Sequence, residues 1–488
     1  MHTLPKPFLS RKRSRRPSTS NQAAKPAPIP RSSLLIDIYL DILRLTSLPR
    51  FPSVPSTACF GFALNSESVS VTTVTRIPSL PFSEHRKLRL AYFATHPIQY
   101  QAPMLRRIAL EPDIDLKVFF ACDLSVRGHL DQEFGVLVKW DTDLLGGYEH
   151  EFLPVLREAI DGQVPAFLRP LNHHVGRKIR DGNFDAVWVH GYNYLTNLQA
   201  LRAARSMKIP GLLRAESTLQ DRPRSRTRLA LKKAFFDLLA PYICGLLSVG
   251  DENAAYWKEY FGDRIPVFPC YYAVNNQLFQ RECAAAAHNR EEFRRFLGLE
   301  PNRPVILFAA KLTPRKRCGD LLEAHRKLVE SGHTHPVPYL LIVGDGEQRN
   351  QLEQTASQAN PGDVRFLGFR NQSEMPPLYD LCNVFVLPSM EEPWGMAVNE
   401  AMNASRPVVV TDRVGCHKNL VQSGTNGFIY PACDTAALAE SLRTVLAGET
   451  WRAMGHESLR IIQNYSFEQN VQGLRAALQM LVPGFRAA

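Results

Sequence analysis

The sequence predicts an α/β protein in which two doubly wound parallel sheets follow one another along the chain. Short apolar runs of strand length recur at intervals, and segments of helical length separate them. Such runs indicate strands buried on both faces, as in parallel sheets covered by helices. The runs form two series, which predicts two domains, and 488 residues are enough to give each domain its own core.

The first series predicts a domain over residues 86–283. The strands are 88–94, 115–121, 184–190, 210–216 and 244–250, and the helices are 101–111, 195–207 and 228–243.

The second series predicts a domain over residues 284–465, and the alanine-rich tract 281–292 is interpreted as the linker. The predicted strands are 304–312, 338–346, 364–369, 384–389, 407–412 and 427–431, with helices at 291–300 and 318–331. Ligands of doubly wound sheets bind at the carboxyl ends of the strands. The sequence therefore predicts a site in a cleft between the two domains.

Residues 1–85 are predicted to be a disordered basic extension, because they are rich in Pro, Ser and Arg. They carry a net charge of +7 out of +11 for the whole chain, so the charge gives no support to nucleic-acid binding by the domains. One island, residues 32–45, has the pattern of an amphipathic helix. Peripheral membrane contact is one interpretation, and a dispensable extension is the interpretation that we favour.

Cysteine usage and hydropathy favour a cytoplasmic protein. The nine cysteines include no C-x-x-C pair, which argues against a zinc site or a disulfide framework. The chain has no uninterrupted apolar stretch of about 18 residues, so no transmembrane helix is predicted, and the N-terminus does not have the pattern of a secretory signal.

The most specific stretch is residues 389–415, SMEEPWGMAVNEAMNASRPVVVTDRVG, which joins a predicted strand to a predicted helix. Gly395 allows a ligand to approach the backbone closely. The N–H groups of Met396 and Ala397, at the positive end of the helix, can bind a diphosphate. Glu392 and Glu400 can accept hydrogen bonds from sugar hydroxyls.

This stretch resembles the glutamate–seven residues–glutamate motif of the retaining glycosyltransferases of family four, which have the GT-B fold of two Rossmann-like domains. The resemblance runs from about Arg89 to the C-terminus. It implies that Glu392 contacts the donor sugar and Glu400 the ribose. It also implies that residues 466–488 form a closing helix that packs back on the first domain.

A second group of residues is AAKLTPRKR, residues 309–317. Lys311 and Lys316 could hold a diphosphate and stabilise the leaving group as charge builds on it. The family usually has Gly-Arg-Leu where this chain has Ala310, Lys311 and Leu312. Lysine keeps the charge of that arginine but loses its bidentate geometry.

Two glycine turns complete the predicted donor side. Gly344 and Gly346 follow a strand and open a helix, which by itself indicates only a tight turn. The resemblance makes this turn a wall of the donor site, and it places Gly368 and Phe369 against the nucleobase.

The first domain supplies the predicted acceptor side. Residues 94–103 carry the hydrogen-bonding side chains His96, Gln99 and Tyr100, which suit a polyhydroxylated ligand, although an ordinary surface loop is an equal alternative. His190 ends a strand and matches a histidine that touches the donor sugar in relatives. Arg214 and Glu216 end the next strand and are further acceptor-side candidates.

Asp141 and Asp143 form a DTD triplet, which metal-dependent transferases of another fold use to bind Mn²⁺ or Mg²⁺. This triplet follows no predicted strand, and short motifs occur often by chance. We therefore expect no metal site and no permanently bound cofactor.

The predicted function is transfer of a sugar, with retention, from a UDP- or GDP-linked donor to a glycan, lipid-linked or small-molecule acceptor. One alternative is a catalytically silent sugar-nucleotide or carbohydrate binder, because Ala310, Lys311 and Ser405 depart from the family pattern. Another is a GT-B nucleotide-sugar epimerase, against which the two glutamates argue. No nucleic-acid partner is expected.

Overall fold

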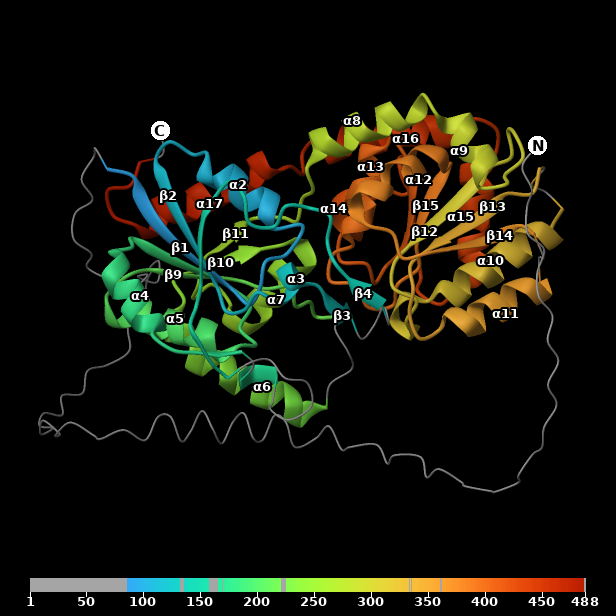
Figure 1. The fold of residues 1–488 in the computed structure, drawn as a ribbon. Coiled ribbons are helices and arrows are strands. Elements are labelled where there is room, and N and C mark those ends of the chain that lie inside the picture. The colour runs from blue at the N-terminus through green and yellow to red at the C-terminus, as the bar shows by residue number, and fades with distance from the viewer. Residues whose placement is uncertain are drawn as a thin grey trace, which may run out of the picture. The chain divides into compact units, whose positions relative to one another are not determined.

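The computed structural model describes residues 86–131, 136–157, 166–168, 170–220, 225–332, 334, 336–359 and 362–486. The extension predicted for residues 1–85, with its helical island, lies outside the described residues. Within the described part, two large parallel sheets follow one another along the chain, each covered by helices (Figure 1).

The first sheet has seven strands, and every pairing within it is parallel. In spatial order the strands are β11 (Val267–Pro269), β10 (Gly245–Ser248), β9 (Gly211–Arg214), β8 (Ala186–His190), β1 (Leu88–Ala94), β2 (Ile114–Phe120) and β5 (Glu149–Phe152). Two short antiparallel pairs lie outside it: β3 (His129–Asp131) with β4 (Val136–Val138), and β6 (Val155–Arg157) with β7 (Leu171–Asn172).

Alternate residues of β1 face opposite sides of this sheet. Leu88, Leu90 and Tyr92 join a core that includes α2 and the last helix, whereas Ala91 and Phe93 join a core that includes α4 to α7. The helices of this half are α2 (Ala102–Ala109), α3 (Leu124–Arg127), α4 (Val175–Gly182), α5 (Leu195–Ser206), α6 (Arg226–Leu239) and α7 (Asp251–Phe261), with 3-10 turns η1 (Ala166–Leu168) and η2 (Ala240–Tyr242).

The second sheet has six strands, again all parallel. In spatial order they are β14 (Val364–Gly368), β13 (Tyr339–Val343), β12 (Val305–Ala309), β15 (Val384–Leu387), β16 (Val408–Thr411) and β17 (Gly427–Tyr430). The order of both sheets doubles back beside the first strand of each, so the predicted doubly wound fold is confirmed.

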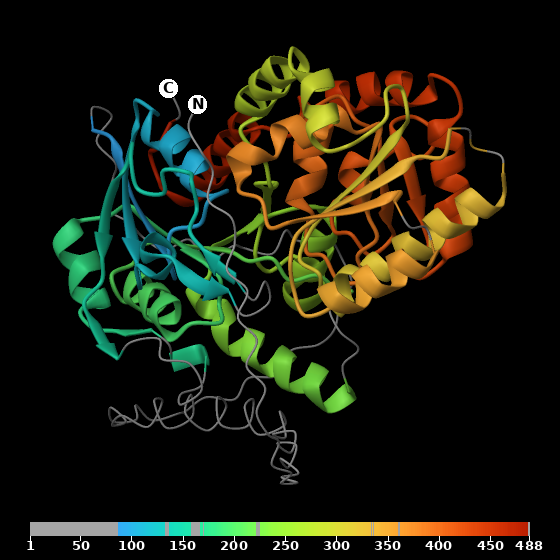
Figure 2. The same cartoon turned by 45° about the vertical axis from the view of Figure 1, so that its right-hand side comes forward.

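Helices cover both faces of the second sheet (Figures 1 and 2). One face carries α10 (Cys318–Glu330), α11 (Arg349–Ala359) and α15 (Thr435–Leu446), and the other carries α8 (Asn276–Ala287), α12 (Pro376–Leu381), α13 (Met396–Asn403) and α16 (Thr450–Ile462). The remaining elements are α9 (Arg290–Phe296), α14 (His417–Leu420), η3 (Pro314–Lys316) and η4 (Gln372–Glu374).

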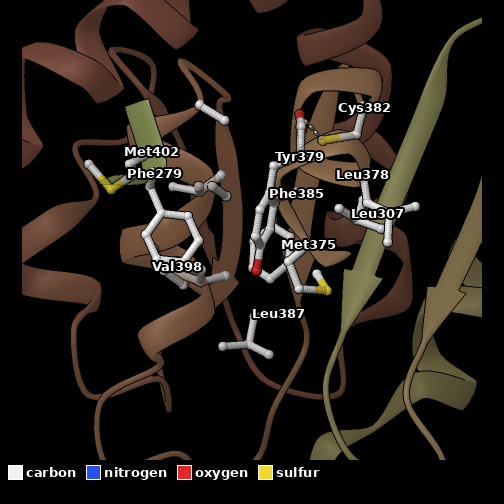
Figure 3. Close-up of a cluster of buried hydrophobic side chains, with 14 of the residues drawn as sticks. Phe279, Leu307, Met375, Leu378, Tyr379, Cys382, Phe385, Leu387, Val398 and Met402 are labelled. Carbon is white, nitrogen blue, oxygen red and sulfur yellow. Dashed lines mark hydrogen bonds between the residues drawn. The ribbon is translucent and has the colours of Figure 1, made fainter. Parts of the chain in front are cut away.

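The interpretation of residues 281–292 as a linker was wrong, because this tract lies largely within α8 and α9. Alanine has the highest helix propensity, and the Asn275 side chain caps α8 by accepting a hydrogen bond from Leu278 N at 3.0 Å. Figure 3 shows Phe279 of α8 packed beside Val398 and Met402 of α13. Helix α8 is therefore part of the second half of the chain.

The last helix, α17 (Phe467–Leu481), returns to the first sheet, as the resemblance implies (Figure 1). Val471, Leu474 and Leu478 join the core formed by β1, β2 and α2. The Arg475 guanidinium forms ion pairs with Glu111 and Asp113 of the first half. Among the residues that the structure describes, no helix is both long enough and apolar enough to cross a membrane.

Candidate functional site

The loops that follow β12, β13 and β14 are bonded to one another at the carboxyl ends of these strands. Ala310 N donates to Val343 O at 3.1 Å, and Gly344 N donates to Gly368 O at 2.9 Å. A Cβ atom on Gly344 would lie 2.0 Å from Ala310 O, and Gly344 has φ of +132°, so this position requires glycine. Lys311 and the two glycine turns expected at the donor side therefore lie along one edge of the second sheet.

Lys316 and Glu392 form an ion pair between the loop after β12 and the loop after β15. Their side chains are 9% and 15% exposed, so both groups are largely shielded from water. A backbone bond from Met390 N to Arg315 O, at 2.8 Å, joins the same two loops. Two of the predicted catalytic residues are thus in direct contact although 76 positions separate them.

Gly415 fixes the loop that carries Glu392. Its N–H donates to Glu392 O at 2.8 Å, and a Cβ atom at Gly415 would lie 1.9 Å from Pro393 O. Three residues after Glu392, Gly395 has φ of +104° and precedes the first turn of α13. Because the first N–H groups of a helix have no partner within it, Met396 and Ala397 present backbone donors beside the Lys316–Glu392 pair.

Glu400 is half-buried in α13, where Tyr379 of α12 donates a hydrogen bond to its Oε2 at 2.7 Å. Gln372 of η4 is its second hydrogen-bonding neighbour. Burial raises the pKa of Glu400 to about 7, because these two neutral partners compensate only part of the lost hydration. The carboxyl is thus poised between its two protonation states at neutral pH.

Gly368 and Phe369 lie at the end of β14, three to four positions before Gln372. The Phe369 ring centroid is 6.2 Å from that of Trp140, a residue of the first half. Sequence reasoning missed Tyr379, Gln372 and Trp140. No pattern in the sequence marks them, because each becomes relevant only through its packing on a predicted site residue.

The loops at the carboxyl ends of β1, β8 and β9 line a pocket of about 500 Å³. Five of the residues predicted for the acceptor side, or for sugar contact, line it. These are His96, Gln99, Tyr100, His190 and Glu216. Pro393, which follows Glu392, also lines the pocket, so it lies next to the loop of the predicted donor side.

Arg214, in contrast, does not line this pocket. It is fully buried, donates to Cys270 O at 2.8 Å, and lies with its guanidinium 4.6 Å from the centroid of the Tyr272 ring. The expected acceptor contact by Arg214 is not found in this structure, because the side chain is enclosed by Met104, Cys270 and Tyr272.

Glu216 accepts hydrogen bonds at one carboxylate oxygen, Oε1, from Tyr100 at 3.2 Å and from Tyr272. His190 Nε2 lies 3.6 Å from the same oxygen. Burial alone would raise the pKa of Glu216, but His190, Tyr272 and the charge of Arg214 outweigh it and hold the pKa at about 2.

His190 is itself held by Gln101, whose Nε2 is 2.8 Å from His190 Nε2. Burial lowers the pKa of His190 below its ordinary value, although Glu216 opposes the shift. At neutral pH the imidazole is therefore uncharged, and the carboxylate carries the charge of this cluster.

The DTD triplet makes protein contacts. Asp141 accepts hydrogen bonds from Ser373 of the second half, and Asp143 accepts from the backbone N–H groups of Leu145 and Gly146 at 3.1 and 2.9 Å. Among the described residues, no group of three His, Cys, Asp or Glu side chains is arranged to hold a metal ion.

Two doubly wound parallel sheets with ligand-facing loops at the carboxyl ends of their strands define a protein of GT-B architecture. Residues 289–465 match the model of the family glycosyl transferases group 1. The predicted family resemblance and fold class are both confirmed.

The chain is similar to an α-D-kanosaminyltransferase of Streptomyces kanamyceticus, with 30% identity over 176 residues, 36% of this chain and 44% of that protein. It is also similar to an amylovoran biosynthesis glycosyltransferase of Erwinia amylovora, with 31% identity over 218 residues, 41% of this chain and 52% of that protein. The chain thus spans about a third to a half of the length of the curated relatives that it matches.

Solved structures support the fold over a larger part of the chain. The Anabaena protein Alr3699/HepE in complex with UDP has a TM-score of 0.61 at 18% identity, covering 81% of this chain and 100% of that one. A sucrose-phosphate synthase from Thermosynechococcus elongatus has a TM-score of 0.59 at 18% identity, covering 81% and 99%. At this identity the likeness establishes the fold alone.

Proposed function

We propose that the protein transfers a sugar from a nucleotide-diphosphate sugar to a hydroxylated acceptor, with retention at the anomeric carbon. The observation that carries the proposal is the ion pair between Lys316 and Glu392, which joins the loops after β12 and β15. The second of these loops leads into the amino end of α13, the helix that carries Glu400. Cationic groups and helix N–H donors suit a diphosphate, and carboxylates suit sugar hydroxyls.

Binding of the donor would place its diphosphate against the N–H groups of Met396 and Ala397, with Lys311 and Lys316 beside it. Glu392 would accept from the donor sugar and Glu400 from the ribose. Gly344, Gly346, Gly368 and Phe369 would form the wall around the nucleotide. The complex of Alr3699/HepE with UDP-glucose supports a uridine donor, and a guanosine donor is the alternative.

Transfer requires stabilisation of the negative charge that builds on the leaving diphosphate. Two lysines and a helix amino end supply fixed positive charge at this position, which is the kind of electrostatic stabilisation that lowers a barrier most. The acceptor would enter through the pocket lined by His96, Gln99 and Tyr100, with His190 next to the reacting sugar. Closure of the two halves would limit hydrolysis of the donor.

The test is a mass-spectrometric assay of the full chain with a panel of UDP- and GDP-sugars, together with Lys316→Ala and Glu400→Ala. We expect product from the wild type. Lys316→Ala should lose about 10²–10³-fold in rate, the usual cost of removing one group that stabilises a developing charge. Glu400→Ala should bind the donor more weakly and transfer more slowly, because it lacks the proposed hydrogen bonds to the ribose. Thermal unfolding of each variant checks that the fold is retained.

Arg460→Ala and Glu440→Ala are the matched controls, because both residues lie on exposed helix surfaces of the same half and pair only with neighbours. They should retain wild-type rates. Turnover by Lys316→Ala at the wild-type rate would remove Lys316 from the mechanism.

Ala310, Lys311 and Ser405 depart from the family pattern and favour, as a second candidate, a catalytically silent binder of nucleotide sugars. Ser405 has φ of +55°, a conformation that suits glycine better. Tight binding of a donor with neither hydrolysis nor transfer would support the binder. Interconversion of the donor sugar without an acceptor would support an epimerase.

A further inference from the structure

Glu216 lines the pocket of the first half, and among the described residues only one of its two carboxylate oxygens accepts hydrogen bonds. Tyr100 and Tyr272 donate hydrogen bonds to Oε1 of Glu216, and His190 Nε2 lies 3.6 Å from the same oxygen. Its other oxygen, Oε2, has no hydrogen-bond partner among the described residues. The Glu216 side chain is 36% exposed and lines the pocket, so Oε2 is available to a ligand there.

The surroundings keep this carboxylate ionised and offer no cation to a ligand. Arg214 lies behind Tyr272, is fully buried, and donates to Cys270 O and towards Met104 Sδ, so it supports the charge of Glu216 without reaching the pocket. The described residues that line the pocket include no Lys, Arg or second carboxylate. A ligand therefore meets a single negative charge.

The rest of the lining suits a ring of sugar size. Trp140, Tyr192 and Tyr194 add aromatic surface, and Gln99 and Asn193 add neutral hydrogen-bonding groups. A volume of about 500 Å³ lies within the range of small-molecule sites. Aromatic walls with a few polar groups bind amphipathic ligands in a defined orientation.

We propose that this pocket binds an uncharged or amine-bearing polyhydroxylated ring, which donates a hydroxyl or ammonium hydrogen bond to Glu216, and that it rejects rings bearing phosphate or carboxylate. A hydroxyl or ammonium satisfies Oε2, whereas an anion placed there meets like charge in a shielded site. The inference rests on the proposed function, since it names the class of acceptor for that reaction. Glu216 is then a specificity-determining residue.

The test measures the affinity of the full chain, saturated with UDP, for five probes: glucose, glucosamine, glucose 1-phosphate, glucose 6-phosphate and glucuronate. We expect glucose and glucosamine to bind, with glucosamine at least as tight. The three anionic probes should bind more than about tenfold more weakly, because close like charges are strongly disfavoured in a shielded site.

Glu216→Gln keeps the shape of the side chain and removes its charge. We expect the affinity of this variant for the anionic probes to rise to within about threefold of its affinity for glucose, and the advantage of glucosamine to disappear. Asp237→Asn is the control, because Asp237 is a surface carboxylate of the same half that pairs with Arg264 outside the pocket. It should keep the wild-type pattern.

Equal or tighter binding of an anionic probe by the wild type would overturn the inference, as would binding of none of the five. If Glu216→Gln does not fold, the wild-type series alone decides between these outcomes. An unchanged pattern in a folded Glu216→Gln would also overturn it. Failure of the proposed function is seen separately, as a wild type that neither binds UDP nor transfers sugar.

Discussion

Two half-buried carboxylates in this protein, Glu400 and Glu216, have pKa values shifted in opposite directions. Burial raises the pKa of Glu400 to about 7, because only the neutral side chains of Tyr379 and Gln372 reach it. Burial acts in the same sense on Glu216, but His190, Tyr272 and Arg214 hold the pKa of that group at about 2. The residue type is the same, and the neighbours decide its charge at neutral pH.

The shift at Glu400 predicts a dependence of stability on pH. Between pH 4.5 and about 7, folded Glu400 keeps a proton that the unfolded chain has lost. Its stabilising contribution is therefore complete below pH 4.5 and is lost as the pH rises to about 7. The difference amounts to at most ~3 kcal/mol, since one pKa unit corresponds to about 1.4 kcal/mol.

Glu400→Gln is uncharged at every pH and should not show this loss. Relative to the wild type, its melting temperature should be nearly unchanged at pH 5 and higher by about 3–8 °C at pH 8. Differential scanning fluorimetry without nucleotide measures both. Glu440→Gln, at an exposed site paired with Arg443, should differ from the wild type in melting temperature by the same amount at pH 5 and at pH 8. A constant difference across this pH range for Glu400→Gln would contradict the assignment.

At the scale of elements, α17 packs closely on the first sheet. A Cβ atom on Gly473 would lie 1.6 Å from Pro269 O of β11, so the helix backbone approaches the strand as closely as glycine permits. Arg475, two residues after Gly473, forms ion pairs that join α17 to Glu111 and Asp113. Both features fix α17 to the first half of the chain.

Gly473→Ala tests this contact. Alanine would favour the helix itself by about 1 kcal/mol, but the clash with backbone must displace α17, so we expect net destabilisation by about 1–3 kcal/mol. Gly319→Ala in α10 is the matched control, because its nearest atom would be a Leu352 methyl at an ordinary 3.8 Å. Urea unfolding should show opposite signs for the two variants. Stabilisation by both would mean that α17 does not lie against β11.

At the scale of the whole described molecule, the two halves meet beside the loop that carries Glu392. Trp394 is 2% exposed, and a Cβ atom on Gly250 of the first half would lie 2.3 Å from its ring. Asn399 of α13 accepts a bond from Trp394 Nε1 at 2.8 Å and donates to Tyr272 O at 3.2 Å. The predicted donor loop is thus positioned partly by residues of the other half.

Gly250→Val should therefore displace Trp394 and change the position of Glu392 relative to the acceptor pocket. We expect the transfer rate to fall by about 10–10²-fold, because misplacement by about 1 Å costs rate steeply. The Kd for UDP, measured by calorimetry, should rise as well, because Trp394 lies two residues before Met396, whose N–H is proposed to bind the diphosphate.

Gly176→Ala in α4 is the control, because a Cβ atom there would make only an ordinary 3.7 Å contact with Ala203. It should have the wild-type rate and the wild-type affinity for UDP. A Gly250→Val variant with full activity would show that the contact between Gly250 and Trp394 does not position the candidate site.

The sequence by itself determined the two series of strands, the glycine turns and the helix after Gly395, because these depend on local hydrophobic patterning and backbone conformation. It also supplied the family resemblance, which residues 289–465 confirm. It did not reveal that tract 281–292 is helical and packs on α12 and α13, since the same alanines suit a linker or a buried helix.

Only the tertiary structure decided which side chains meet. It paired Lys316 with Glu392, packed Glu400 against Tyr379, turned Arg214 away from the pocket and gathered three partners at one oxygen of Glu216. These contacts join residues that lie 21 to 116 positions apart. The chemistry of each group is local, but its charge and accessibility are set by neighbours that only the packing of whole elements brings within reach.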